Sequence, residues 1–148
     1  MSHRVTALCS LLVLGLLAGT TAPAETPSSP DTTAYIISPS EGETVSNPVT
    51  VRFGMRGMGV APAGVEHPAT GHHHLLIDVD GLPPAGAPIP ADEKHRHFGG
   101  GQTEVTLDLK PGKHTLQLLL GDARHVPHTP PVVSERIDTL FRNSLAET

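Results

Sequence analysis

Histidine is the residue type in this chain whose number and spacing point most directly to chemistry. The chain has ten histidines among 148 residues, and nine of them follow residue 24. Eight of these nine lie in three stretches, at residues 67–74, 95–97 and 125–128. Neutral imidazole is a good ligand for zinc, copper, nickel and iron. The clustering therefore indicates a candidate transition-metal site.

Two of these stretches contain the pattern H-x-H, in which a single residue separates two histidines. In an extended segment, residues i and i+2 face the same side with Cα atoms about 6.5–7 Å apart. That separation lets two imidazoles converge on one ion. A third pair of histidines flanks Pro127, which stiffens its loop. We therefore predict that the metal ligands come from six residues: His72, His74, His95, His97, His125 and His128.

Strand parity separates the three consecutive histidines. Alternate residues of a strand point to opposite faces, so His73 shares the expected core side with Leu75. His72 and His74 share the opposite side with Asp78, so we expect that side to be polar. Four further residues are reserve ligands, and the two thioethers among them would favour copper(I): His67, His73, Met55 and Met58.

Other interpretations of the histidines remain open at this point. The imidazoles could form a structural or pH-responsive polar network, or their number could be incidental. They could also form a metal-free recognition surface for a partner in the cell envelope. An enzyme would need an open coordination position with a bound water, and no nucleophile-elbow motif appears. We expect a binding protein without catalytic residues, in which three acids could orient ligand histidines: Asp92, Glu93 and Asp122.

The amino-terminal 24 residues have the three parts of a cleaved secretory signal. Arg4 provides the positive charge, an almost uninterrupted apolar run extends over residues 5–18, and Ala22-Pro23-Ala24 is an A-x-A cleavage site. The apolar run is shorter than the ~20 residues that a membrane-spanning helix needs. We therefore predict a periplasmic or secreted protein that begins at Glu25 and has no membrane span after cleavage.

Composition excludes several classes of site and partner. The chain has one cysteine, Cys9, which lies within the predicted signal. The remaining chain can form neither disulfides nor thiolate metal sites. It carries nine Lys and Arg against fifteen Asp and Glu, without a basic cluster. This balance argues against nucleic acid as a partner.

Short runs with period-2 alternation of apolar and polar residues recur along the chain and predict half-buried antiparallel strands. Prolines and glycines separate the runs, and helical periodicity is absent after the signal. An immunoglobulin-like antiparallel β-sandwich of about seven strands is the expected fold. The strands are expected at residues 34–38, 49–54, 73–79, 104–109, 114–120 and 132–141.

The domain is expected to span residues 34–142, between a flexible lead-in at 25–33 and a tail at 143–148. The stretch Ala87-Pro88-Ile89-Pro90 could form a short edge strand marked by its prolines. With that strand in place, three long loops carrying most of the histidines would lie at one pole of the sandwich. These loops are residues 55–72, 91–103 and 121–131.

Several motifs in this region are distinctive together. They are Gly71-His72-His73-His74-Leu75-Leu76-Ile77-Asp78, His95-Arg96-His97-Phe98-Gly99-Gly100-Gly101-Gln102-Thr103-Glu104, Pro111-Gly112-Lys113-His114-Thr115-Leu116 and Gly121-Asp122-Ala123-Arg124-His125-Val126-Pro127-His128. Over residues 55–140 the chain resembles a family of small exported bacterial proteins known only as a domain of unknown function. The resemblance implies a periplasmic single-domain protein and supplies no catalytic residues.

The expected chemistry can also be compared with two known copper families. In outline the chain looks like sandwich-type periplasmic copper carriers, although Met55 and Met58 do not reproduce their motif. Copper oxygenases with an amino-terminal histidine brace do not fit, because the mature chain would begin with Glu25. We therefore predict an exported binding module that holds copper or zinc, with a metal-free envelope interaction protein as the alternative.

Overall fold

The computed structural model describes residues 25–144, so the predicted signal peptide at 1–24 and the end of the tail lie outside the described residues. Within this range the chain forms nine β-strands and no helix, which confirms the predicted all-β sandwich. None of the described residues forms a helix long and apolar enough to cross a membrane. The strands are β1 (Thr33–Ser38), β2 (Thr44–Ser46), β3 (Val49–Arg56), β4 (Gly59–Val60), β5 (Thr70–Ile77), β6 (His95–His97), β7 (Glu104–Leu107), β8 (Gly112–Gly121) and β9 (Ile137–Arg142).

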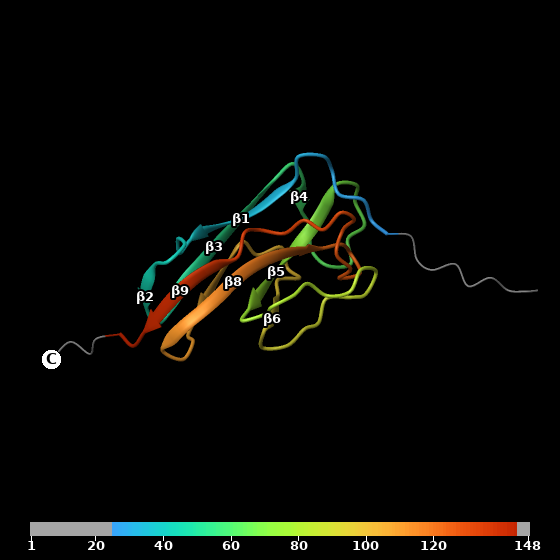
Figure 1. Cartoon of the computed structure of the whole chain (residues 1–148). Helices are drawn as coiled ribbons and strands as arrows, with labels where there is room; N and C mark the ends of the chain where they lie inside the picture. Colours follow the sequence, from blue (N-terminus) through green and yellow to red (C-terminus); the bar gives the residue numbers. More distant parts are fainter. Residues whose placement is uncertain (1–24, 145–148) are drawn as a thin grey trace, which may run out of the picture.

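The strands form two sheets, which Figure 1 shows as two layers. The smaller sheet has the order β1-β3-β7, and the larger has the order β2-β9-β8-β5-β4 with β6 also paired to β5. The main pairings are antiparallel, as predicted, but two short edge strands pair in parallel: β2 with β9 and β4 with β5. Three of the nine strands, β2, β4 and β6, have only two or three residues.

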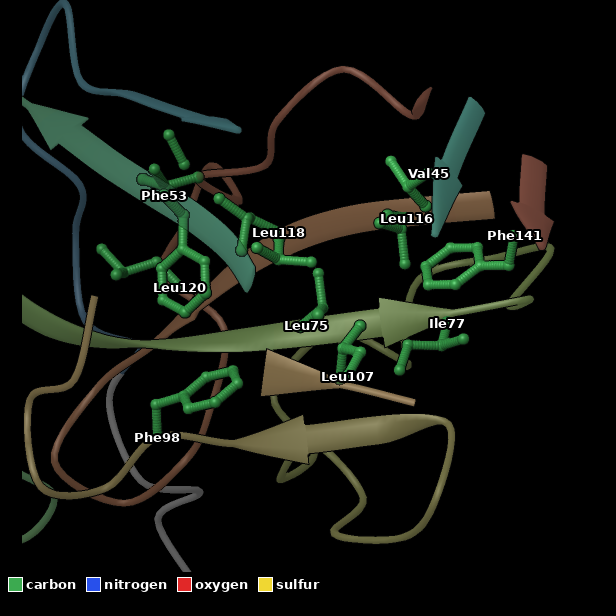
Figure 2. Packing of buried hydrophobic residues seen from close by; sticks show 13 residues of the cluster. Val45, Phe53, Leu75, Ile77, Phe98, Leu107, Leu116, Leu118, Leu120 and Phe141 are labelled. Carbon is green, nitrogen blue, oxygen red and sulfur yellow. The ribbon is translucent and has the colours of Figure 1, made fainter. Parts of the chain in front are cut away.

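The main core lies between the two sheets and is built by the alternation seen in the sequence. Leu75 of β5 and Leu116, Leu118 and Leu120 of β8 are fully buried on the inner face of the larger sheet. Phe53 of β3 approaches them from the smaller sheet. Figure 2 shows these side chains packed between the two layers. Period 2 therefore identified the core side of each long strand.

The outer face of β5 and β8, which we expected to be polar, is buried and carries apolar side chains besides His72 and His74. Leu76 and Leu119 form a second, smaller core with Ile89. The expected edge strand at residues 87–90 was wrong, since these residues form a loop that covers this face. Prolines at both sides of Ile89 remove the N–H groups that a ladder requires. The short strand of this region is β6 instead.

The three long loops come together at one end of the sandwich. The N–H of Ala63 donates to the carbonyl of Gly99 at 2.8 Å, and the N–H of Gly64 donates to the carbonyl of Ala123 at 2.9 Å. In Figure 1 this end carries the loop that follows β8 and the first described residues, in blue. Histidines from separate loops are thereby brought to the same end.

Candidate metal centre

Strand β5 positions His72 and His74 on the outer face of the larger sheet. Both side chains are buried, with 0% and 1% of their surface exposed, and their ring centroids are 4.8 Å apart. The i and i+2 spacing brings them to one face, as predicted. Gly121 of β8, which lies opposite His72, leaves space for them. A Cβ atom at this glycine would lie 2.7 Å from Cε1 of His74.

Strand β6 adds His97 to this pair. The register places His97 opposite His74, so both side chains point to the same face. The centroid of the His97 ring lies 5.0 Å from that of His72 and 5.1 Å from that of His74. Gly99 provides space here, because a Cβ at this position would collide with the His97 ring. His97 is exposed and forms the outer side of the group.

His125 completes the group from the loop that follows β8. Its ring centroid lies 4.6 Å from that of His97 and 5.0 Å from that of His72. The distance to the ring of His74 is 6.1 Å. His125 has a φ of 67°, in the left-handed region that few residues other than glycine adopt. Its N–H donates to the carbonyl of Asp122, and its carbonyl accepts from Ile89.

Asp122 organises the loop that carries His125. Its Oδ1 accepts the N–H groups of Arg124 at 2.8 Å and Val126 at 2.9 Å, while Oδ2 accepts the hydroxyl of Thr26 at 2.7 Å. Burial would raise the pKa of this carboxyl, but these hydrogen bonds outweigh burial and lower the pKa below its usual value. The carboxylate therefore fixes the backbone of the loop, where the sequence had suggested that it could orient an imidazole.

We call these four side chains the histidine cluster: His72, His74, His97 and His125. One nitrogen from each of His72, His74 and His97 can be chosen so that all three lie within 4.8 Å of one another. Four imidazoles around one tetrahedral ion, with bonds of about 2.0–2.1 Å, would place their ring centroids about 5 Å apart. The six centroid distances of the cluster run from 4.6 to 6.1 Å. His72, His74 and His97 could hold a metal ion.

The cluster contains buried nitrogen atoms that make no hydrogen bond within the part of the chain that the structure describes. These are both ring nitrogens of His72 and Nδ1 of His74. Most buried polar side-chain atoms in proteins have a partner, and an unsatisfied one costs about 1–3 kcal/mol. A neutral imidazole has one nitrogen with a lone pair and one that carries the proton, so a metal ion would satisfy one nitrogen of each ring.

The environment lowers the pKa of three imidazoles of the cluster, those of His72, His74 and His97, and so favours their neutral form. Burial lowers the pKa of His72 to about 4, and the neighbouring rings of His97 and His125 add to this effect. Burial, together with the ring of His72, lowers the pKa of His74 to about 3. The pKa of His97 is also lowered, chiefly by burial. A neutral imidazole has a free lone pair on one nitrogen, and this neutral form binds metals.

Two of the six predicted ligands lie outside the cluster. His95 is opposite Leu76 in the sheet, and its Nδ1 is paired with Oδ1 of Asp92 at 2.8 Å. His128 is buried, with Nε2 3.2 Å from the carbonyl of Thr70. The H-x-H spacing correctly predicted the face on which His95 lies. Its Nδ1, however, is paired with the carboxylate of Asp92.

The four reserve ligands also lie elsewhere. His73 points into the main core, as its parity predicted, with its ring centroid 5.0 Å from that of Phe53. His67 is exposed, and its Nδ1 is 2.9 Å from the carbonyl of Pro68. Met55 and Met58 pack against the main core, so neither thioether is part of the cluster.

Gly121 and Gly99 are site residues that the histidine pattern does not identify. Their role depends on sterics, since each occupies a place where a side chain would meet an imidazole. The sequence signal for them is a glycine that ends the long apolar run of β8 and another that follows His97 by two residues. Such glycines often mark a close approach of other groups to the backbone.

Residues 51–140 match the protein family described as Domain of unknown function (DUF4399). The chain belongs to this family. No curated protein and no solved structure matches the chain. All four histidines of the cluster lie within the part that matches the DUF4399 family. The resemblance to an uncharacterised domain family is thus confirmed, and the function must be inferred from the site.

Proposed function

We propose that this DUF4399 domain binds a single transition-metal ion, zinc or copper, through His72, His74, His97 and His125. The observation that carries the proposal is the spacing of the four rings, whose centroids lie 4.6–6.1 Å apart. Three of the four come from strands and are held by sheet register. The buried rings of His72 and His74 support the same conclusion, because both nitrogens of His72 and Nδ1 of His74 make no hydrogen bond among the described residues.

The donor set favours divalent zinc or copper over copper(I). Imidazole suits both metals, whereas thioethers and thiolates select copper(I). Met55 of β3 and Met58 pack against the main core, and the chain has no cysteine after residue 9. Zn²⁺ and Cu²⁺ are therefore the metals to test first.

The number of ligands favours binding over catalysis. Catalytic zinc sites keep one position for water or substrate, whereas sites with four protein ligands are closed. In this proposal His125 adds a fourth ligand to His72, His74 and His97, which would fill a tetrahedral site. We therefore expect a metal-binding module and not a hydrolytic enzyme.

We further propose that the protein works outside the cytoplasm, in the periplasm or after secretion. The support is the signal-like sequence of residues 1–24, with its charged start, apolar run and A-x-A site. Expression with an epitope tag at the carboxyl end, followed by mass measurement of the mature chain, tests this. A chain that retains residue 1 would contradict it.

The metal proposal is tested by titrating the protein with Zn²⁺ and Cu²⁺ and weighing the complex by native mass spectrometry. We expect one ion per chain and loss of binding in His97→Ala. The loss should be about 100-fold or more, since outer-shell partners alone typically contribute 10–100-fold. His95→Ala is the matched control, because it removes a histidine of the same strand that pairs with Asp92.

The alternative is a metal-free interaction protein whose histidine loops recognise a partner in the cell envelope. Exposed His97 suits such a surface, but His72 and His74 are buried and could not contact a partner. Absence of stoichiometric binding at micromolar Zn²⁺ and Cu²⁺ would overturn the metal proposal and favour this alternative.

A further inference from the structure

The first described residues are docked beside the loop that carries His125, at the end of the molecule where the long loops meet (Figure 1). The N–H of Thr129 donates to the carbonyl of Thr26 at 2.9 Å, and the N–H of Ser28 donates to the carbonyl of Thr129 at 3.1 Å. This segment, which the sequence suggested to be a flexible lead-in, is thus paired with residue 129. It is held against the carboxyl end of the loop that spans residues 122–128.

The same segment also reaches the start of that loop. The hydroxyl of Thr26 donates to Oδ2 of Asp122 at 2.7 Å, across 96 positions of the sequence. The other carboxylate oxygen of Asp122 holds the N–H groups of Arg124 and Val126. Thr26 therefore contacts a side chain that accepts the backbone N–H groups on both sides of His125.

The position of His125 depends on the conformation of this loop, whereas strands hold the other members of the cluster. His72 and His74 are fixed by the register of β5 with β8. His125 instead lies in a loop with a positive φ, held by backbone hydrogen bonds to Asp122 and Ile89. A positive φ in a residue other than glycine persists only where the surroundings impose it. A change at Asp122 would therefore move the imidazole of His125 first.

We infer that Thr26 is a positioning residue for the metal site, acting through Asp122 on His125. This inference rests on the proposed metal-binding function. The segment that follows the predicted signal cleavage point stabilises the loop that carries His125 and so completes the metal site. The affinity for metal then depends on a residue that is not a ligand and lies at the opposite end of the sequence.

Thr26→Val tests the inference, because valine keeps the shape of threonine and removes the hydroxyl. We expect Zn²⁺ affinity to fall about tenfold, since hydrogen bonds to a charged group are among the stronger ones. The loss should be partial, because Arg124 also donates to Oδ2 of Asp122, at 3.3 Å. Thr26→Ser retains a hydroxyl and should restore most of the affinity.

Thr32→Val is the matched control. It removes a hydroxyl of the same segment that donates to the carbonyl of Ser29 at 2.7 Å, away from Asp122. We expect unchanged affinity. Electron paramagnetic resonance of the Cu²⁺-loaded full-length chain provides a second measurement, which a general loss of stability would not alter. The spectrum of Thr26→Val should shift toward that of His125→Ala.

Combining both substitutions shows whether Thr26 acts through His125. In the His125→Ala background, Thr26→Val should cause no further loss of affinity, because the group that it positions is gone. A further tenfold loss there, or wild-type affinity in Thr26→Val alone, would overturn the inference while leaving the metal site intact. If the wild-type chain binds neither ion, the proposed function fails and the inference fails with it.

Discussion

The two ends of strand β8 place histidines in opposite environments. Near its start, His114 has a partner for each ring nitrogen: Nδ1 is 2.7 Å from Oδ2 of Asp78, and Nε2 is 2.8 Å from the carbonyl of Lys110. Near its end, Gly121 faces His72, whose two ring nitrogens have no hydrogen-bond partner among the described residues. Histidine is thus a hydrogen-bonded structural residue near one end of β8, and near the other end it has a lone pair that a metal could accept.

The pKa values follow from this difference. Burial would lower the pKa of His114, but its bonds to Asp78 and to the carbonyl of Lys110 outweigh burial and raise the pKa above 6.5. Burial and neighbouring rings lower the pKa of His72 to about 4. A charged imidazole cannot bind a metal, whereas a neutral one can. The hydrogen-bond partners of His114 and the lack of partners at His72 therefore separate a structural histidine from a metal-binding candidate at the two ends of β8.

The largest expected effect is on the pH dependence of stability in the metal-free protein. Burial lowers the pKa of His72 and His73 to about 4 and that of His74 to about 3. Between these values and 6.5, the unfolded chain binds more protons than the folded chain. The free energy of unfolding should therefore fall as pH decreases from 6.5 toward 4, by up to about 1.4 kcal/mol per pH unit for each proton.

Urea denaturation at pH 7.5, 6, 5 and 4.5 would measure this slope. His67→Gln serves as the control, since His67 is exposed and outside the cluster. Its slope should equal that of the wild type, whereas replacing His74 by leucine should reduce the slope. A free energy of unfolding that is constant from pH 7.5 to 4.5 would contradict the neutral, buried state of His72, His73 and His74.

A smaller effect is expected from Gly121→Ala, which tests whether the cluster needs the space beside β8. The added Cβ would lie 2.7 Å from Cε1 of His74 and 3.3 Å from Cδ1 of Ile89. Forcing these groups apart should lower the free energy of unfolding by about 1–3 kcal/mol and weaken Zn²⁺ binding. Gly81→Ala is the control, because no other group lies within 4 Å of the place that its Cβ would occupy. Equal stability and affinity in both variants would show that His74 has room to move.

The sequence predicted the parts of this site that depend on short-range geometry. Period 2 placed His73 on the core side and His72 with His74 on the opposite face, as the structure shows. It also identified the strands that carry Leu75 and Leu118, because burial on one face imposes alternation. These features follow from the pleat of a strand and from the burial of one of its faces in a single core.

The remaining parts depend on contacts between distant segments, which a single sequence does not encode locally. The outer face of β5 is covered because Ile89 packs on Leu76 and Leu119, so alternation did not reveal its burial. His95 differs from His97 because Asp92 is within reach of its Nδ1. His125 and His128 are close together in the sequence, yet the turn held by Asp122 places His125, and not His128, in the cluster. Loop conformation decides these cases.

The smallest expected effect concerns His114 and has the opposite sign with pH. Because its pKa is raised in the folded chain, its contribution to stability is complete below pH 6.5 and is lost as pH rises through the raised pKa. His114→Gln should lower the free energy of unfolding by about 1.5 kcal/mol at pH 6 and by less at pH 8.5, measured by urea denaturation. Zn²⁺ affinity should not change. An equal loss at both pH values would mean that shape rather than charge makes His114 stabilising, and the contrast between the two ends of β8 would then rest on hydrogen-bond partners alone.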